Sequence, residues 1–292
     1  MARDDQRSTT LVRRQLGRLL KEAREGAGLT QEQAGRLLEM GKATVGRLEK
    51  GENDKVKQRD VDAIGNVYGL PPEKIAELKA LAAQTATKPW WQASRHLIYP
   101  GYNTYLGLEA GASQLQFYQP LIVPGILQTP DYARAIEQPY RPTDTPADVE
   151  TRVALRMQRA AVLTRRYKPA RAEFVLHENV LHTVVGSRDV MAGVCRHLAD
   201  MSTRENVSIR IVPYMAGNPT HTVPTPYIII DFPPESREPS VVYTETTTGT
   251  MIFEEEADLK EFRDIHETLE RAALGEQESK DRLRTIARRY KP

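Results

Sequence analysis

Four residues within six positions, Lys42, Ala43, Thr44 and Arg47, have the types and spacing needed to contact DNA. Lys and Arg side chains reach the O6 and N7 atoms of guanine, and small side chains leave room for a thymine methyl group. The same polar types also hold phosphate oxygens. On a helix whose opposite side carries Val45, all four would point away from the core. We therefore expect this segment to face a nucleic acid.

The elements that must position these residues form a predicted helix-turn-helix over residues 28–51. Thr30 and Gln33 have the spacing of a capping box, so they predict a short helix over about 31–38. A second helix follows and ends at Gly51. In such a motif the second helix enters the major groove while the first crosses the backbone.

Small and apolar residues supply the packing that this motif requires. Ala34 and Gly35 allow the two helices to cross closely, and Val45 and Leu48 would hold the second helix against the core. Gln31 stands at the N-terminus of the first helix, where its amide and the free backbone N–H groups can bind a phosphate.

Apolar residues at three- and four-residue spacing extend the helical region, which predicts a small all-α domain of five helices before about residue 86. From Arg7 to Arg59 the chain has 13 basic and 7 acidic residues, whereas the whole chain carries a formal charge of only +2. A local positive excess on a helix-turn-helix is expected of a DNA-binding domain. The alternative is a helical bundle whose exposed residues happen to be basic.

Residues 11–80, through LTQEQAG and the closing RLEKG, resemble the Cro/repressor-type (Xre) family of lambda-repressor-like DNA-binding domains. The resemblance implies that Lys42, Ala43 and Arg47 contact bases. It implies a structural ion pair between Arg24 and Glu49. The phosphate contacts expected in this framework come from four residues: Gln31, Thr44, Lys50 and Lys55.

The chain departs from the family pattern at two positions. The turn between the two helices usually holds a glycine, where this chain has Glu39. Gly46 lies inside the second helix, where glycine costs about 1 kcal/mol relative to alanine.

The remainder of the chain predicts an α+β domain with a mainly antiparallel sheet. The expected organisation is a flexible tail over 1–10, the DNA-binding domain over 11–86, a linker over 87–101 and a regulatory or dimerisation domain over 102–292. Strands are expected at 172–177, 207–213, 226–232, 240–245 and 250–254. Helices are expected at 103–118, 147–166, 187–203, 255–273 and 276–290.

VPGILQTPDYAR (123–134), FVLHENVLHTVVG (174–186) and the VVYTE segment resemble the C-terminal domain of unknown function in WhiJ-type, antitoxin-like actinomycete regulators. The resemblance covers residues from about 88 to the end of the chain. It implies oligomerisation and the sensing of a partner, such as a small protein encoded nearby. It brings no catalytic residues.

Other residues that could do chemistry have ordinary explanations. His177 and His182 in HENVLH are five residues apart, about 140° around a helix, whereas a zinc-protease helix needs histidines four apart. Cys195 lies in a segment of helical apolar spacing, which favours a buried packing thiol. The chain contains no phosphate-binding glycine loop and no nucleophile elbow. We therefore expect no enzyme activity, no metal and no cofactor.

Two charged blocks remain open to several interpretations. Residues 151–172 contain seven basic and no acidic residues, and residues 254–274 contain eight acidic and three basic residues. Solvated helix faces explain each block separately, and a mutual or intersubunit match would explain them together. The basic block, like the basic end of the chain, could also bind DNA flanks or an acidic partner.

These observations together predict a homodimeric, sequence-specific transcription regulator that binds a double-stranded operator. The single cysteine excludes a disulfide framework, and the charged N-terminus and the lack of long apolar runs predict a cytoplasmic protein without a membrane segment. Two alternatives are an antitoxin-like module that sequesters a small protein and a ligand-sensing regulator with a pocket in its C-terminal domain.

Overall fold

The computed structural model describes residues 9–53, 55–86, 89–99, 101–140, 144–246 and 249–291. Most of the predicted tail over residues 1–10 lies outside these ranges. The chain divides into two compact units, of which the first groups residues 1–93 with 103–111 and 232–238. The second contains residues 94–102, 112–231 and 239–292. Two segments that the sequence assigned to the C-terminal domain are thus part of the first unit.

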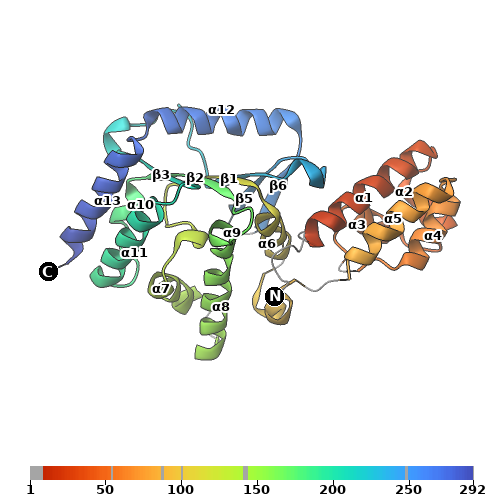
Figure 1. Ribbon diagram of the computed structural model, residues 1–292, viewed down its shortest axis with the longest axis horizontal. Helices are drawn as coiled ribbons and strands as arrows, with labels where there is room; N and C mark the ends of the chain where they lie inside the picture. Colours follow the sequence, from red (N-terminus) through yellow and green to blue (C-terminus); the bar gives the residue numbers. More distant parts are fainter. Residues whose placement is uncertain are drawn as a thin grey trace. The chain divides into compact units, whose positions relative to one another are not determined.

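Five α-helices make up the main part of the first unit, which confirms the predicted all-α head (Figure 1). They are α1 (Thr9–Gly26), α2 (Gln31–Leu37), α3 (Lys42–Glu49), α4 (Gln58–Val67) and α5 (Pro72–Gln84). Their apolar stripes meet in one core around Leu16, Leu20, Ile64 and Leu78, all at most 1% exposed. The core forms because each helix repeats apolar residues at helical spacing.

Within the first unit, a buried carboxylate ties α1 to the segment 232–238. Glu238 accepts hydrogen bonds from Arg14 Nε and Arg18 Nη1, both at 2.5 Å, and its side chain is fully shielded from solvent. Arg18 also donates to the backbone carbonyl of Arg237 at 2.7 Å. A buried carboxylate needs such donors because an unpaired charge away from water is costly. No local sequence pattern around Glu238 indicates this role.

The second unit is built on a six-stranded mixed sheet in the order β3-β2-β1-β4-β5-β6. Its strands are β1 (Gln114–Gln119), β2 (Arg171–His177), β3 (Val207–Val212), β4 (Tyr227–Asp231), β5 (Val241–Thr246) and β6 (Gly249–Phe253). The β1–β2 and β2–β3 pairs are parallel, and the other three pairs are antiparallel. The α+β class and the antiparallel majority agree with the sequence prediction.

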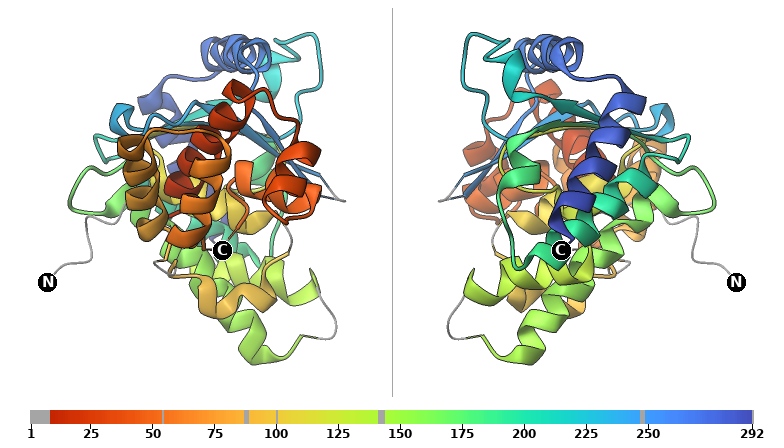
Figure 2. Two further views of the ribbon diagram at one scale, coloured as in Figure 1. Left: turned by 90° about the vertical axis from the view of Figure 1, so that its right-hand side faces the viewer. Right: turned by 90° about the vertical axis from the view of Figure 1, so that its left-hand side faces the viewer.

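Helices cover both faces of this sheet. The helix α12 (Glu256–Ala272) lies along one face, over Tyr118, Val175 and Tyr227, while α8 and α11 lie on the opposite side (Figure 2). The helix α13 packs against α11 and the edge strand β3. The remaining bounds are α6 (Tyr102–Gly111), α7 (Pro130–Tyr140), α8 (Pro146–Arg159), α9 (Ala161–Thr164), α10 (Asn179–His182), α11 (Arg188–Met201) and α13 (Glu276–Tyr290); short 3-10 turns occupy Gln92–Leu97, Gly125–Leu127, Tyr214–Ala216 and Pro234–Ser236.

The expected helix over 103–118 is wrong in its second half. The helix α6 ends at Gly111, and Gln114–Gln119 form β1, a strand between β2 and β4 in the sheet. Leu115 and Phe117 are buried on one face, and Tyr118 on the other. Polar Gln114, Gln116 and Gln119 masked the strand pattern, because alternation is weak when both faces of a strand are covered.

A buried histidine on α12 makes the second unit sensitive to acid. His266 is 2% exposed, and its Nδ1 lies 3.2 Å from the Tyr227 hydroxyl. Burial lowers the pKa of His266 from its ordinary 6.5 to about 4. Between these two pH values the unfolded chain binds a proton on this ring and the folded chain does not. The contribution of His266 to the free energy of unfolding is therefore fully present above pH 6.5 and is lost as the pH decreases toward 4.

We predict that His266→Phe, whose ring does not titrate, loses about 3 kcal/mol less stability than the wild type when the pH falls from 7 to 4. Urea unfolding at a series of pH values measures this difference. The exposed His96→Asn serves as the control, since it should leave the acid sensitivity of the wild type unchanged. An unchanged pH profile in His266→Phe would show that other groups cause the sensitivity.

Candidate nucleic-acid interface

The turn between α2 and α3 is built by close backbone contact. Thr30 and Gln33 form the predicted capping box at the start of α2. A Cβ atom at Gly35 would lie 2.6 Å from the Met40 carbonyl oxygen, so only glycine fits at this crossing. Glu39 has a φ of 53°, the left-handed conformation that glycine adopts without strain. This explains why the related family usually has glycine at that position.

A buried ion pair fixes α3 on α1. Arg24 Nε lies 2.5 Å from Glu49 Oε1, and Arg24 Nη1 donates to the Leu29 carbonyl oxygen at 2.6 Å. Both charged residues are less than 10% exposed. The hydrogen bond to Glu49 raises the pKa of Arg24 above its ordinary value. The geometry is the one that the family resemblance implied for these two residues.

Gln31 joins the same network through its side-chain amide. Its Nε2 donates to Glu49 Oε2 at 2.8 Å, so Glu49 connects α1, α2 and α3. This contact orients the Gln31 side chain, which is half-buried, at the start of α2. One N–H of the amide group is used in this bond, and an amide nitrogen carries two.

Glycine also allows α1 to approach the end of α3. A Cβ atom at Gly17 would lie 2.4 Å from the Glu49 carbonyl oxygen, and one at Gly51 would lie 2.7 Å from the Arg14 backbone nitrogen. The sequence analysis overlooked Gly17. A glycine inside an amphipathic helix was the available signal, because its cost in helix stability implies a packing reason.

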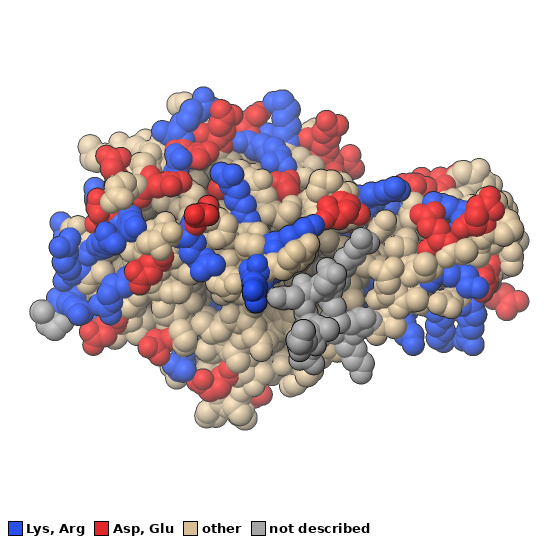
Figure 3. Space-filling model, in the orientation of Figure 1, with Lys and Arg blue, Asp and Glu red and all other residues tan. Residues whose placement is uncertain are grey.

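The outer side of α3 carries the residues that the sequence singled out. Lys42, Ala43 and Arg47 are exposed, while Val45 and Leu48 are 1% and 7% exposed on the opposite side. Thr44 is half-buried, and Lys50 and Lys55 are exposed. Among the described residues, no hydrogen bond or ion pair engages the Lys42, Arg47, Lys50 or Lys55 side chain. The surface view shows basic side chains along one side of the first unit (Figure 3).

Three arginines of the basic block 151–172 are engaged inside the second unit, whereas Arg166 and Arg171 are exposed. Arg152 Nε donates to Glu137 at 2.7 Å, and Arg156 donates both to Glu137 and, at 3.2 Å, to Gln128. Arg159 is 7% exposed and donates to the Tyr102 hydroxyl. The interpretation of this block as a solvated helix face is therefore wrong for these three arginines.

The histidines and the cysteine of the second unit take structural positions. His177 ends β2 and His182 ends α10, and the rings of both lie against the Tyr214 ring, with centroids 5.3 and 5.8 Å apart. Cys195 is fully buried, and burial raises the pKa of its thiol to about 12, which disfavours the thiolate. Across the described ranges, no group of three or more His, Cys, Asp or Glu residues is placed to hold a metal ion.

Comparison with known families assigns both regions. Residues 102–285 match the family described as a domain of unknown function (DUF5753), and residues 15–78 match a helix-turn-helix domain. Neither a curated protein nor a solved structure matches the chain. In the part of the chain that the structure describes, no helix is long and apolar enough to cross a membrane. The helix-turn-helix match indicates a DNA-binding regulator.

We predict that Glu49→Gln lowers the free energy of unfolding of the first unit by about 3–5 kcal/mol, because it removes the buried counter-charge of Arg24 and leaves only the exposed carboxylate of Glu25, at 3.2 Å. The exposed pair Arg36–Glu32 provides the control. Its variant Glu32→Gln should cost less than about 1 kcal/mol. Urea unfolding followed by circular dichroism measures both. Equal effects of the two variants would contradict a structural role for the buried pair.

Two glycines on neighbouring helices should respond oppositely to alanine. Gly46→Ala is expected to stabilise the first unit by about 1 kcal/mol, since alanine is the better helix former and its Cβ would lie an ordinary 3.6 Å from Gln31. Gly35→Ala is expected to destabilise it by about 1–3 kcal/mol through the contact with Met40. Thermal unfolding of both variants checks the signs, and a stabilising Gly35→Ala would refute the close crossing.

Proposed function

The chain belongs to the DUF5753 family, and from this premise and its helix-turn-helix head we propose that it is a sequence-specific transcription regulator in which α3 is the recognition helix. The observation that supports the proposal most directly is that α3 has one buried side and one exposed, basic side. Val45 and Leu48 fix one side in the core, and Lys42 and Arg47 extend from the other into solvent. A helix held in this way can enter the major groove without losing its packing.

In this proposal Lys42, Ala43 and Arg47 contact base edges, because they lie on the exposed side of α3. Phosphates are held by the residues around them, namely Gln31, Thr44, Lys50 and Lys55. The network of Arg24, Glu49 and Gln31 gives these contacts a fixed frame. The head would thus act as a Cro/repressor-type (Xre) domain.

We infer that the regulator acts as a homodimer on an inverted repeat. One short recognition helix contacts few base pairs, and two copies about 34 Å apart would read two half-sites on one side of the duplex. The second unit would supply the dimer contact and sense a protein partner or a ligand, without catalysing a reaction. The resemblance of the sequence patterns to WhiJ-type actinomycete regulators supports this proposal, and binding to DNA implies a cytoplasmic location.

The second candidate is an antitoxin-like module whose main activity is to sequester a small protein. The sequence resemblance of the second unit favours it. A small protein that co-purifies with the intact chain, together with weak and unselective DNA binding by the chain alone, would support this candidate over the first.

We predict that Arg47→Ala and Lys42→Ala each weaken binding to the operator by about 1–3 kcal/mol and reduce sequence selectivity. Fluorescence anisotropy on DNA from the gene's own upstream region and on scrambled DNA, over a salt series, measures both quantities. Lys79→Ala on α5, outside the helix-turn-helix, is the matched control. Equal losses on both DNAs would contradict base contacts by these residues.

For the phosphate contacts, Lys50→Ala and Lys55→Ala should weaken binding uniformly across sequences. Each should also reduce the slope of log affinity against log salt by about 1, because one fewer counterion is released. A loss confined to the specific operator would exclude a simple phosphate contact.

A further inference from the structure

Five of the exposed large apolar residues that the structure describes in the second unit lie in the loops after the parallel strands β1 and β3. Tyr214, Met215 and Val223 in the loop after β3 are 50%, 95% and 90% exposed. The loop after β1 adds Leu121 and Ile122, at 56% and 38%. Asn179 connects the two loops, since its Nδ2 donates to the Pro120 carbonyl oxygen and its Oδ1 accepts from the Tyr214 hydroxyl. Clustered exposed apolar side chains indicate an interaction surface.

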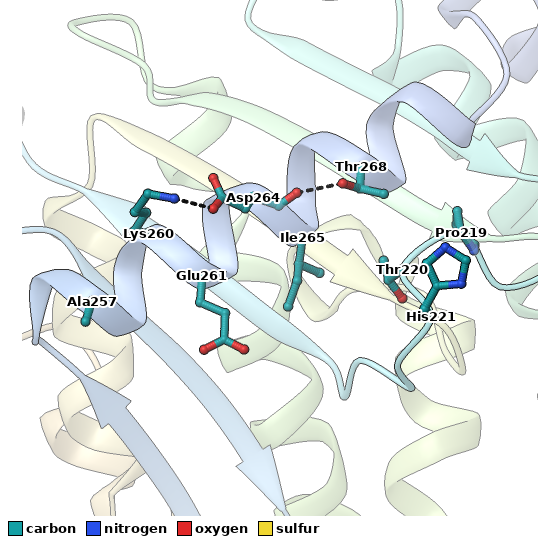
Figure 4. A pocket seen from close by; sticks show the side chains of 9 residues that line it. All are labelled: Pro219, Thr220, His221, Ala257, Lys260, Glu261, Asp264, Ile265 and Thr268. Atoms are coloured by element: carbon teal, nitrogen blue, oxygen red, sulfur yellow. Dashed lines mark hydrogen bonds and ion pairs between the residues drawn. The ribbon is translucent and has the colours of Figure 1, made fainter.

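The loop after β3 shares a depression with α12 and is connected to α13 through Glu178. Pro219, Thr220 and His221 line a shallow depression of about 510 Å³ together with Glu261 and Ile265 of α12 (Figure 4). At its other end, the Tyr214 backbone N–H donates to Glu178, which also accepts from Arg282 of α13 at 2.7 Å. The apolar loop therefore has α12 on one side and α13 on another.

The acidic charge of α12 is not neutralised by its own lysine and arginines. Lys260 pairs with Asp264 at 2.6 Å, Arg263 with Asp231 at 2.6 Å, and Arg271 with Glu267 at 3.6 Å. Acidic residues of the first half of the helix remain exposed, and Figure 4 shows Glu261 extending from α12 on the side of Thr220 and His221. Among the described residues, no ion pair involves Glu256 or Glu261.

The charge of α13 is opposite. Residues 280–291 contain six basic residues and one acidic residue. Leu283, Ile286 and Ala287 face the protein, whereas Arg284, Arg288 and Arg289 are exposed. Within the ranges that the structure describes, no ion pair joins α12 to α13. The acidic α12 and the basic α13 therefore do not neutralise each other through ion pairs in this part of the chain.

We propose that a second copy of this chain docks on the surface formed by the 214–223 loop, α12 and α13, which we call the corner surface. A two-fold axis through the apolar loop places the acidic α12 of each copy against the basic α13 of the other and buries Met215 and Val223 between them. Apolar residues at the centre and charged residues at the rim are the usual arrangement of a protein interface, and a two-fold contact must be self-complementary.

The corner surface extends along two helices of similar length. The helices α12 and α13 contain 17 and 15 residues. At a rise of about 1.5 Å per residue they extend about 25 and 22 Å. A standard interface takes roughly 800 Å² from each partner. This inference rests on the proposed homodimer and names the surface that would form it.

Sedimentation equilibrium of the full chain tests the proposal. Wild type should be dimeric, and raising the salt from about 50 to about 500 mM should weaken the dimer, because charged rims are screened. Met215→Glu and Val223→Glu should each weaken it at least about tenfold, as they place a charge at an apolar contact. Met251→Glu, in the edge strand β6 at 52% exposure, is the matched control and should leave it unchanged.

Charge reversal provides a second test that does not depend on the apolar loop. Reversing α12 with Glu256→Lys and Glu261→Lys should dissociate the dimer, as should reversing α13 with Arg284→Glu and Arg288→Glu. Combining both reversals in one chain should restore the dimer, since α12 and α13 again carry opposite charges. The corner surface is refuted if the dimer persists in Met215→Glu and in the variant with only α12 or only α13 reversed. It is also refuted if the variant with both helices reversed stays monomeric while its circular dichroism matches that of the wild type.

DNA anisotropy on the same variants separates this inference from the proposed function. Dimerisation through the corner surface without selective DNA binding would retain the surface and refute the regulator. Selective binding by a wild type that is monomeric, or that dimerises elsewhere, would retain the regulator and refute the surface.

Discussion

The buried carboxylate of Glu49 is the interaction on which the geometry of the first unit depends. It lies at the end of α3 and receives hydrogen bonds from Arg24 on α1 and Gln31 on α2. A charge buried this deeply is stable only where its partners have nearly ideal geometry, so the network holds three helices in one arrangement. Apolar packing alone is less directional, since Val45 and Leu48 could be accommodated at several rotations of α3.

Close backbone contacts at glycines also fix the positions of α1, α2 and α3. Gly17 and Gly51 let α1 approach the end of α3, and Gly35 lets α2 approach the turn. Side chains at these positions would separate the helices and lengthen the bonds of Glu49. Glu39, in a left-handed conformation, carries a strain that glycine would relieve. The contacts on both sides of the turn fix the backbone conformation at Glu39, and the helix-turn-helix therefore retains this strained residue.

The sequence predicted the five helices and the exposed side of α3 because these depend on local periodicity and capping. It predicted the strands β2 to β6 for the same reason, since each has an apolar run. It failed at β1, whose glutamines look helical until the strand is placed between two neighbours. It also missed Glu238, because a carboxylate that pairs with arginines more than 200 positions away leaves no local pattern. Periodicity reveals elements, whereas the partners of buried charges are set by tertiary structure.

The net charge of the chain also fails to show which charged residues are buried in pairs and which are exposed. A formal charge of +2 suggests a nearly neutral protein, yet the chain contains a basic head, an acidic α12 and a basic α13. The structure separates arginines that are buried in pairs, such as Arg152, from those that remain exposed, such as Arg288. Only the exposed charges act on partners, because a buried pair has little field beyond itself. Three arginines of the basic block 151–172 thus stabilise the interior of the second unit, whereas α3, α12 and α13 carry exposed charges.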